Sequence, residues 1–318
     1  MAATSPEISL IYQFVLGREA DRVGLDYFSA LALSQNVSTH EIAKLLISSD
    51  EFKTKVGGNT DPVEVVLDGF SIFVRRSDRD IGSAIVRGVG YEPHVSALLR
   101  RELRSGDVFL DVGANLGFFT MLAAHLVGPT GQVVAVEPMD KNLQLVYLGL
   151  ERNAFHNVEV FPFGASDRSG VVAIITDPNT SNALVQSAPS SKKISVHAPV
   201  RTLDWMCRNL DRLDVVKMDI EGHELFAWRG ARELFERFKP RIATEFHPYA
   251  MRENSGLDCS DYLAMLFDYS AEVEVILSAE CVKICTTQPE VMREWEASDQ
   301  RHGGRGTSHL DLFVRPRA

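Results

Sequence analysis

Hydrophobic residues recur at helical spacing in the first fifty positions and in short, strand-like runs after them. Between Ser5 and about Val56 the spacing predicts three helices, and Ser38 with Glu41 three residues later is a typical helix start. Beyond a Gly- and Pro-containing linker at 55–62, a short hairpin is expected, and apolar runs then alternate with helical patterns. This order predicts a small all-helical domain (1–56) followed by an α/β domain (57–318) with a mostly parallel sheet.

One stretch, DVFLDVGANLGFFT from Asp107 to Thr120, combines a buried strand, an acid, a tight turn and a helix start. Gly113 and Gly117 bracket the turn, and glycine lets a backbone bend tightly and lets a ligand approach main-chain N–H groups. The helix that follows directs its positive dipole end toward that ligand. The stretch therefore predicts a nucleotide-binding turn.

The acids around this turn indicate which nucleotide it binds. A dinucleotide-binding turn would read G-x-G-x-x-G, whereas this one reads G-A-N-L-G. Asp111 would repel a pyrophosphate but favour a ligand that carries an ammonium and a sulfonium. The next apolar run, Gln132 to Val136, ends in Glu137, where an acid usually holds ribose hydroxyls. Together these residues favour S-adenosylmethionine over NAD and disfavour an NAD-dependent oxidoreductase.

Composition limits which classes of binding partner the protein can have. The 318 residues are 45% hydrophobic and carry a net charge of −10, which argues against a nucleic-acid duplex or an anionic membrane as main partner. The N-terminus lacks a basic leader, and no apolar run approaches the roughly 18 residues of a membrane span. Four cysteines without a C-x-x-C pair are typical of reduced thiols. We therefore expect a cytoplasmic protein.

Further cofactor contacts are expected from two loops. A third strand, Val158 to Phe163, precedes GASDRSG, and in a doubly wound sheet that loop faces the adenine. Ala165, Ser166 and Asp167 are therefore candidate contacts, with a plain turn as the alternative. Tyr91 and Glu92 precede the cofactor strand where the chain could close over the ligand, although an ordinary aromatic at a helix start and a capping acid are equal alternatives. The polar connector at 177–191 is long, and we interpret it as part of the acceptor pocket or its lid.

A second informative stretch runs from 214 to 248. Two predicted parallel strands, Val215 to Met218 and Arg241 to Thr244, each end in acids and histidines. Because the carboxyl ends of neighbouring parallel strands meet at one sheet edge, these side chains are expected beside the cofactor turn. The catalytic candidates are Asp219, Glu221, His223, Glu245 and His247.

These pieces, with VVAVEP, NVEVFPFGASDRSG and RTLDWM, resemble the FkbM-type methyltransferase family from about Asp61 to Arg317. The resemblance implies the class I methyltransferase fold, which is Rossmann-like: a seven-stranded, mostly parallel sheet with the last strand antiparallel and helices on both faces. It implies O-methylation of a hydroxyl on a sugar, glycan or related natural product, with S-adenosylhomocysteine as product. The implied cofactor-binding positions are Asp111, Gly113, Asn115, Gly117 and Glu137, with Ala114 and Pro138 adjoining them.

The first fifty residues resemble a small bacterial helical domain of undefined function, often found near glycan-modifying enzymes. This resemblance implies a module that docks a protein or glycan, and a merely stabilising helical cap is an equal alternative. For the whole chain, a catalytically inactive cofactor-binding protein that docks a partner and an N-methyltransferase are the alternative functions.

Methyl transfer to a hydroxyl requires a group that takes the hydroxyl proton. Imidazole suits neutral pH, so His223 is the preferred base, with a surface histidine at a helix start as the alternative. We predict that His223→Ala lowers turnover without weakening cofactor binding.

Some small-molecule O-methyltransferases bind a divalent ion with acids at the fourth and fifth strand ends. Asp219, Glu245 and His247 fit that placement. The usual Asp-Asp or Asp-Asn pair at the fifth strand is replaced by Glu-Phe-His, so no metal ligand is assigned from the sequence.

Overall fold

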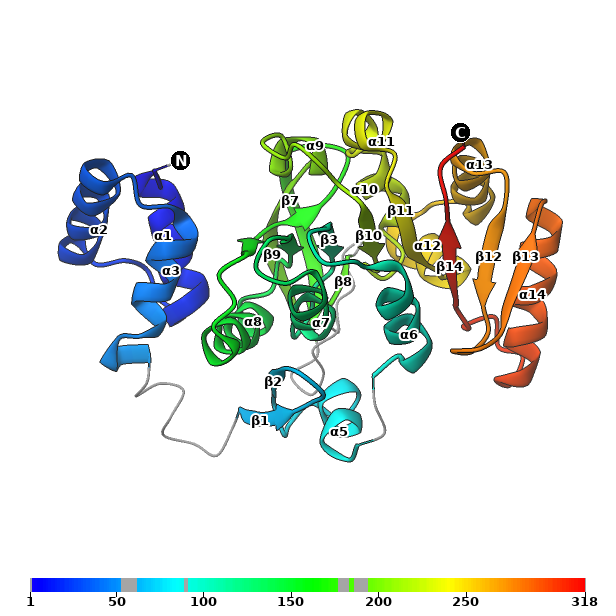
Figure 1. Ribbon diagram of the computed structural model, residues 1–318, viewed down its shortest axis with the longest axis horizontal. Helices are drawn as coiled ribbons and strands as arrows, with labels where there is room; N and C mark the ends of the chain where they lie inside the picture. Colours follow the sequence, from blue (N-terminus) through cyan, green and yellow to red (C-terminus); the bar gives the residue numbers. More distant parts are fainter. Residues whose placement is uncertain (1, 53–61, 89–90, 177–182, 186–193, 318) are drawn as a thin grey trace.

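The computed structural model describes residues 2–52, 62–88, 91–176, 183–185 and 194–317 (Figure 1). The three expected N-terminal helices are present: α1 (Ser5–Leu16), α2 (Arg22–Gln35) and α3 (Thr39–Ile47). The predicted start of α3 is confirmed, because the Glu41 carboxylate accepts a bond from the Ser38 N–H (2.8 Å) and Ser38 Oγ accepts one from the Glu41 N–H (3.3 Å). The expected hairpin is also present, as β1 (Val63–Val66) paired antiparallel with β2 (Ser71–Val74).

The central sheet has eight strands in the order β13-β12-β14-β11-β10-β3-β4-β5. The strands from β11 to β5 run parallel, and β14 enters antiparallel between β11 and β12. Their bounds are β3 (Val108–Val112), β4 (Gln132–Val136), β5 (Val158–Phe161), β10 (Val215–Met218), β11 (Arg241–Phe246), β12 (Val273–Ile276), β13 (Val282–Cys285) and β14 (Leu310–Val314). This is the expected class I methyltransferase sheet with one addition. The extra strand, β13, is a four-residue edge strand that pairs with β12.

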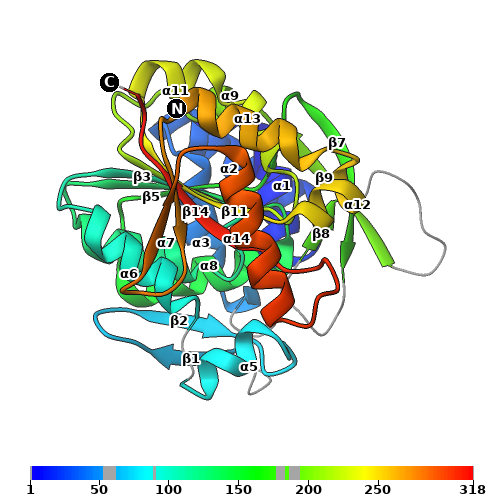
Figure 2. The same cartoon turned by 90° about the vertical axis from the view of Figure 1, so that its right-hand side faces the viewer.

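Alternating side chains of the central strands build two cores. On β3, Phe109 belongs to one hydrophobic cluster, whereas Leu110 and Val112 belong to the other. Period-two alternation with both faces buried is what a sheet covered by helices on both sides requires. Figure 2 shows the sheet edge-on, with α9, α11 and α13 on one side and α6, α7 and α8 on the other.

The helices follow the sheet order. The helix after β3 is α7, the helix after β4 is α8, and α10 to α12 follow β10 and β11. The bounds are α5 (Ile81–Val86), α6 (Pro93–Glu102), α7 (Phe118–Val127), α8 (Asp140–Asn153), α9 (Leu203–Met206), α10 (Glu224–Arg229), α11 (Arg232–Phe238), α12 (Pro248–Ser255), α13 (Cys259–Tyr269) and α14 (Gln288–Arg301).

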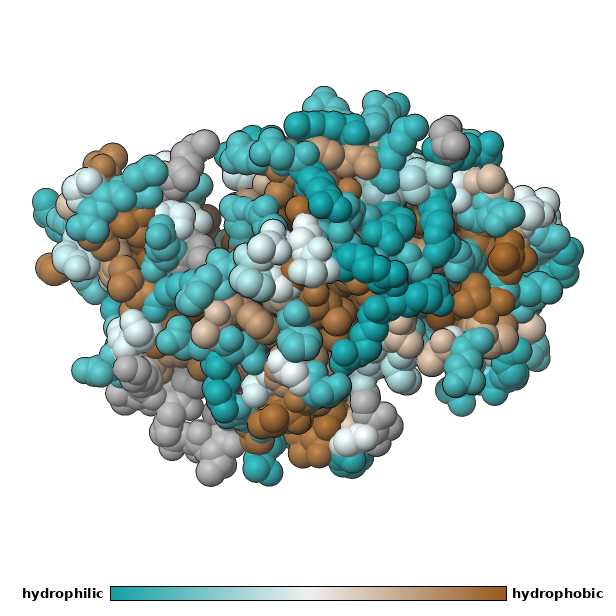
Figure 3. All heavy atoms as spheres, in the orientation of Figure 1, coloured by the Kyte–Doolittle hydropathy of each residue, from teal (hydrophilic) through white to brown (hydrophobic). Residues whose placement is uncertain are grey.

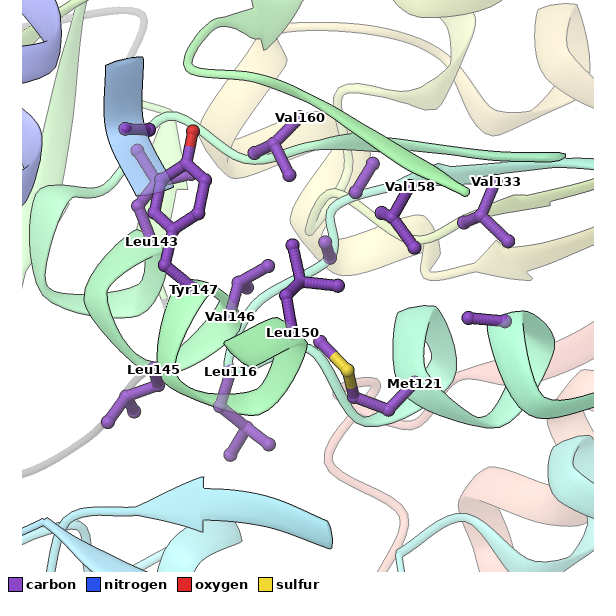
Figure 4. Close-up of a cluster of buried hydrophobic side chains, with 14 of the residues drawn as sticks. Leu116, Met121, Val133, Leu143, Leu145, Val146, Tyr147, Leu150, Val158 and Val160 are labelled. Carbon is purple, nitrogen blue, oxygen red and sulfur yellow. The ribbon is translucent and has the colours of Figure 1, made fainter. Parts of the chain in front are cut away.

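The N-terminal helices pack on the α/β part of the chain through α8. One hydrophobic cluster runs from Ile8 of α1 and Ile42 of α3 to Tyr147 of α8 and the strands beneath it. Figure 4 shows Tyr147, Val160 and Leu143 in this region, with Leu150 and Met121 between α8 and α7. The boundary at residue 56 stays a prediction, and the linker expected at 55–62 lies, except for Pro62, outside the described residues.

A second, four-stranded sheet of order β6-β9-β7-β8 stands beside the central one. It confirms the two expected β-runs as β7 (Gly170–Thr176) and β9 (Ile194–Arg201) and adds β6 (Gly164–Ala165) and β8 (Ala183–Val185). Apart from β8, the connector interpreted as an acceptor lid lies outside the described residues.

The surface mixes polar and apolar residues. In the face drawn in Figure 3, apolar residues gather over the β1–β2 hairpin and α5, where Val66 and Val86 are exposed. Within the described part of the chain, no helix combines the length and apolar character that crossing a membrane requires.

Candidate active site

The turn after β3 lies where the strand order of the sheet reverses. From β3 the chain proceeds to β4 and β5 on one side, whereas β10 and β11 lie on the other. Ligands of open α/β sheets bind in the crevice at such a point, outside the carboxyl ends of the strands. Gly113 follows β3 there with φ +85°, and a Cβ built on it would lie 2.0 Å from the Asp219 carbonyl oxygen. The two strand ends therefore touch through backbone, which only glycine permits at residue 113.

Backbone hydrogen bonds fix the turn to β4. The N–H groups of Gly113 and Ala114 both donate to the Val136 carbonyl, at 2.9 and 3.0 Å. Asn115 adopts φ +51°, which directs its N–H at Glu137 Oε2 (2.8 Å). The predicted nucleotide-binding turn, bracketed by Gly113 and Gly117 and called the cradle below, thus joins the ends of β3 and β4.

Glu137 lies directly after β4, beside this turn, and is 4% exposed. Its Oε1 accepts a bond from the Met139 N–H (2.9 Å), in addition to the Asn115 bond to Oε2. Burial raises the pKa of Glu137 to about 7, although the two backbone N–H bonds act in the opposite direction. The carboxylate is therefore oriented by the backbone and keeps lone pairs for a hydroxyl of a ligand.

Asp111 occupies a different place from the one predicted. It is fully buried beneath the turn, where its Oδ2 accepts a bond from Thr120 Oγ1 (2.6 Å), and it does not line the cleft. Burial raises the pKa of Asp111, while the nearby Lys217 lowers it. Its Oδ1 has no hydrogen-bond partner among the described residues. This geometry makes Asp111 a support for the first turn of α7, with one buried oxygen that attracts positive charge.

A cleft of about 1120 Å³, counted to its open mouth, lies outside the strand ends. Most predicted site residues line it: Tyr91, Gly113, Asn115, Glu137, Pro138, Ala165, Asp219, Glu221, His223 and Glu245. The other predicted positions do not line it: Asp111, Ala114, Gly117, Ser166 and His247. The structure thus brings the cofactor turn and the acids of β10 and β11 into one cleft.

Several lining residues were not predicted. Apolar side chains cover part of the wall, and polar ones come from α8 and from β14 with the residue before it. Among them are Ile81, Asn142, Phe163, Val172, Val200, His309 and Asp311. The register of β14 on β11 places Asp311 opposite Glu245. Antiparallel pairing of HLDLFV with ATEF would have indicated this from the sequence. Glu92, which was expected beside Tyr91 where the chain could close over the cofactor, also lines the cleft.

The acids at the ends of β10 and β11 are crowded. Lys217 is buried (4% exposed), and its Nζ donates a bond to Asp219 Oδ2 at 2.9 Å. Glu221 adopts φ +56°, an uncommon conformation for a non-glycine residue that is often found at functional sites. Burial, and next the Asp219 charge, raise the pKa of Glu221 to about 8; the same two causes hold the pKa of Glu245 well above its usual range. At neutral pH this region therefore holds or exchanges protons readily.

His223, the preferred base, lies at the start of α10 and is 7% exposed. Its Nε2 lies 3.2 Å from Ser166 Oγ, and its Nδ1 lies 3.2 Å from Ser255 Oγ. Burial lowers the pKa of His223 to about 4. A neutral imidazole donates one of these bonds and accepts the other, so neither ring nitrogen is left over for a substrate proton. Its role as base stays a prediction that this geometry does not favour.

His247 and Ser166 do not line the cleft. His247 precedes α12, and its Nδ1 accepts a bond from the Ala250 N–H (2.9 Å), while its ring stacks on His309 at 5.9 Å. Ser166 lies behind Ala165 on the side of His223. Both act in the described structure as supports for loops around the cleft.

The fold and the cleft together define the class of the protein. A sheet of this order, with a glycine turn after the first parallel strand and an acid at the end of the next one, defines a Rossmann-like nucleotide-binding fold of the class I methyltransferase type. Comparison with known families is more specific: residues 111–285 match the "Methyltransferase FkbM domain". The chain belongs to the FkbM methyltransferase family, which confirms the resemblance seen in the sequence. Residues 3–56 match a domain of unknown function, DUF4214.

The individual relatives are distant. Hexuronic acid methyltransferase AglP from Haloferax volcanii is 24% identical over 239 residues, which cover 74% of this chain and 92% of that protein. An rRNA uracil methyltransferase, RlmD from Acinetobacter baylyi, is 33% identical over 90 residues, but these cover only 26% of this chain and 19% of that protein. A solved FkbM methyltransferase from Methylobacillus flagellatus superimposes with a TM-score of 0.41 at 17% identity, over 96% of this chain and 58% of that one.

The family implies S-adenosylmethionine as methyl donor, and the residues of the cleft fit it. Glu137 offers a buried, oriented carboxylate to ribose hydroxyls, and the apolar wall of Phe163, Ala165 and Val200 suits an adenine ring. The excess of acid near Asp219 suits a ligand with a positive sulfonium. These residues would hold the cofactor, which supplies an electrophilic methyl group.

Proposed function

We propose that the protein transfers a methyl group from S-adenosylmethionine to a hydroxyl of a sugar or glycan. One observation carries the proposal: the cofactor turn and the carboxylates at the carboxyl ends of β10 and β11 share one cleft. The relation to a hexuronic acid methyltransferase along most of both chains supports a sugar as acceptor.

The chain's contribution to this reaction is mainly positional. Displacement at the methyl carbon needs the acceptor oxygen in line with the breaking carbon–sulfur bond, so a cleft that fixes both partners supplies much of the rate. The hydroxyl must lose its proton as the new bond forms, and the carboxylates of Asp219, Glu221 and Glu245 line the cleft to accept it. With His223 bonded on both sides, Glu221 is the proton acceptor that we favour.

The proposal is tested with the purified full chain and methyl-labelled S-adenosylmethionine. The acceptor panel contains glycosides of hexuronic acids, glycosides of neutral hexoses and amino sugars, and label is located by mass spectrometry and NMR. We expect label in a methyl ether of one sugar class, with formation of S-adenosylhomocysteine.

Two results would overturn the proposal. Label on the nitrogen of an amino sugar would indicate an N-methyltransferase. Tight binding of S-adenosylhomocysteine, without transfer to any acceptor of the panel or of a cell extract, would indicate a cofactor-binding docking protein.

We also propose that the N-terminal helices position the enzyme on its acceptor. α2, which buries Phe28 and Ala32, exposes Val23 (79%) and Leu33 (81%) and so offers apolar area to a partner. If this is right, the double variant Val23→Ser, Leu33→Ser should keep its thermal stability and its S-adenosylhomocysteine affinity but raise KM for a polymeric acceptor. An unchanged KM would leave these helices a structural role.

A further inference from the structure

Three carboxylates converge beneath the inner wall of the cleft. Asp219 follows β10, Glu245 lies near the end of β11, and Glu224 is the first residue of α10. One carboxylate oxygen from each lies within 4.8 Å of the other two. Asp219 and Glu245 line the cleft itself, so the group is reached from the side of the reacting molecules.

Two of these carboxylates have an oxygen without a hydrogen-bond partner in the part of the chain that the structure describes. Glu224 and Glu245 are 0% and 8% exposed, and the Oε2 atom of each has no hydrogen-bond partner among the described residues. Buried carboxylate oxygens without a donor are costly, because they lose hydration and gain nothing in return. The other oxygen of Glu224 is held by the N–H groups of Ile220 (2.9 Å) and Gly222 (3.2 Å), which fixes the direction of Oε2.

Positive charge near the three carboxylates is insufficient to balance them. Lys217 bonds Asp219 at 2.9 Å, and the half-exposed His309 lies 3.6 Å from Glu245 Oε1. Glu221, Glu92 and Asp311 add further acid to the same wall. A buried excess of carboxylates requires either a shared proton or a cation.

The spacing suits a cation. Two oxygens on opposite sides of an ion lie at most twice the metal–oxygen distance apart, about 4.6–5.2 Å for Ca²⁺ and about 4.0–4.2 Å for Mg²⁺. The three oxygens lie within 4.8 Å of one another, which is compatible with Ca²⁺, whereas at that limit Mg²⁺ would require them to move closer together. Three protein oxygens also leave coordination positions for water and for a hydroxyl in the cleft.

We infer that Asp219, Glu224 and Glu245 form a binding site for a divalent cation that prefers oxygen ligands. This set differs from the one considered from the sequence, because His247 faces Ala250 and Glu224 takes its place. The role of the ion rests on the proposed function: beside the cofactor it would orient the acceptor hydroxyl and lower the pKa of that hydroxyl. Binding itself does not depend on that function.

The test measures binding of Mn²⁺ to the full chain by loss of the free-ion electron paramagnetic resonance signal. We expect one ion per chain, displaced by Mg²⁺ or Ca²⁺. Glu224→Gln and Glu245→Gln should each weaken Mn²⁺ binding at least about tenfold. Replacing a residue that only hydrogen-bonds to a metal ligand already has an effect of about this size, and replacing the ligand itself should have a larger one. Glu253→Gln is the matched control: it removes the same charge from an exposed residue of α12 and should bind Mn²⁺ like the wild type.

Circular dichroism and S-adenosylhomocysteine binding establish that each variant is folded, and Glu245→Gln carries the test if Glu224→Gln does not fold. The inference is overturned if the wild type takes up no Mn²⁺ at millimolar concentration, or if the variants bind it as the control does. A proton shared between carboxylates would then explain why Glu224 Oε2 and Glu245 Oε2 are buried without a donor among the described residues.

Activity separates this inference from the proposed function. Full sugar methylation in excess chelator, with no Mn²⁺ uptake, removes the metal site and leaves the proposed function intact. Mn²⁺ uptake that the Gln variants weaken, without methylation of any sugar, retains the site and removes the function.

Discussion

Replacing Gly113 by alanine perturbs the point where β3 and β10 meet. The native residue has φ +85°, and the added Cβ would lie 2.0 Å from the Asp219 carbonyl oxygen and 3.0 Å from its carbonyl carbon. Both neighbours are backbone atoms, so no side-chain rotation relieves the contact. The two strand ends must move apart, and the cradle moves with them.

The expected cost has two parts. Alanine at positive φ costs about 1–2 kcal/mol. Inserting a methyl group where packing leaves no room adds about 1–3 kcal/mol. Gly113→Ala should therefore destabilise the protein by about 2–5 kcal/mol. Gly256→Ala separates the two parts, because Gly256 has φ +66° and its Cβ would meet nothing within 4 Å. That variant should lose only the first part.

The assay is urea unfolding followed by the fluorescence of the three tryptophans, at pH 7 and without ligand. Titration calorimetry with S-adenosylhomocysteine completes it, and affinity should fall in Gly113→Ala but not in Gly256→Ala. If Gly113→Ala costs no more than Gly256→Ala, the backbone contact between the two strand ends is not as described.

Three further predictions concern the cleft. Because burial raises the pKa of Glu137 to about 7, its carboxyl is protonated below that pH and cannot accept hydrogen bonds from two ribose hydroxyls. The affinity for S-adenosylhomocysteine, measured by calorimetry, should therefore rise severalfold from about pH 6 to about pH 8. In Glu137→Gln the affinity should not change over this range. His223 has its pKa lowered to about 4 from 6.5, so its stabilisation is present above pH 6.5 and lost as pH falls toward 4. Between pH 7 and 4, in chelator-treated protein, the free energy of unfolding should fall by up to about 3 kcal/mol more in the wild type than in His223→Gln. Equal decreases in the two proteins, measured by urea unfolding, would contradict this. Glu221→Gln should lower kcat about 10²-fold with unchanged S-adenosylhomocysteine affinity, and unaltered turnover would exclude Glu221 as the proton acceptor.

The sequence was sufficient for most strands of the central sheet and for their order, but not for β13 or for β6 and β8 of the second sheet. Residues 107–120 define a strand, turn and helix through local chemistry, since apolar runs, glycines and acids follow directly from what each segment buries. The acids after β10 and β11 were predictable in the same way, because parallel strands present their carboxyl ends at one edge. Eight strands instead of seven reflect β13, whose Ile284 is 56% exposed and whose four residues carry little pattern.

The direction of side chains at the site could not be read in this way. Asp111 lies one residue beyond a buried leucine in a strand covered on both faces, so the pattern does not show that it points to Thr120 and not to the cleft. The bonds of His223 to Ser166 and Ser255 join segments 57 and 32 residues apart, and only tertiary packing brings them together. Tertiary packing likewise brings Glu92 to the cleft and places Glu224 beside Asp219 and Glu245.

The place of β14 sets an order of events during synthesis. This strand lies between β11 and β12 and supplies Asp311 beside Glu245, yet it is made after every other strand of the sheet. Domains generally fold as units, and within one chain the N-terminal domain folds first during synthesis. Because β14 pairs with both β11 and β12, the central sheet is continuous only after residue 314 has been made. The half of the cleft that holds Glu245 and Asp311 is therefore completed last.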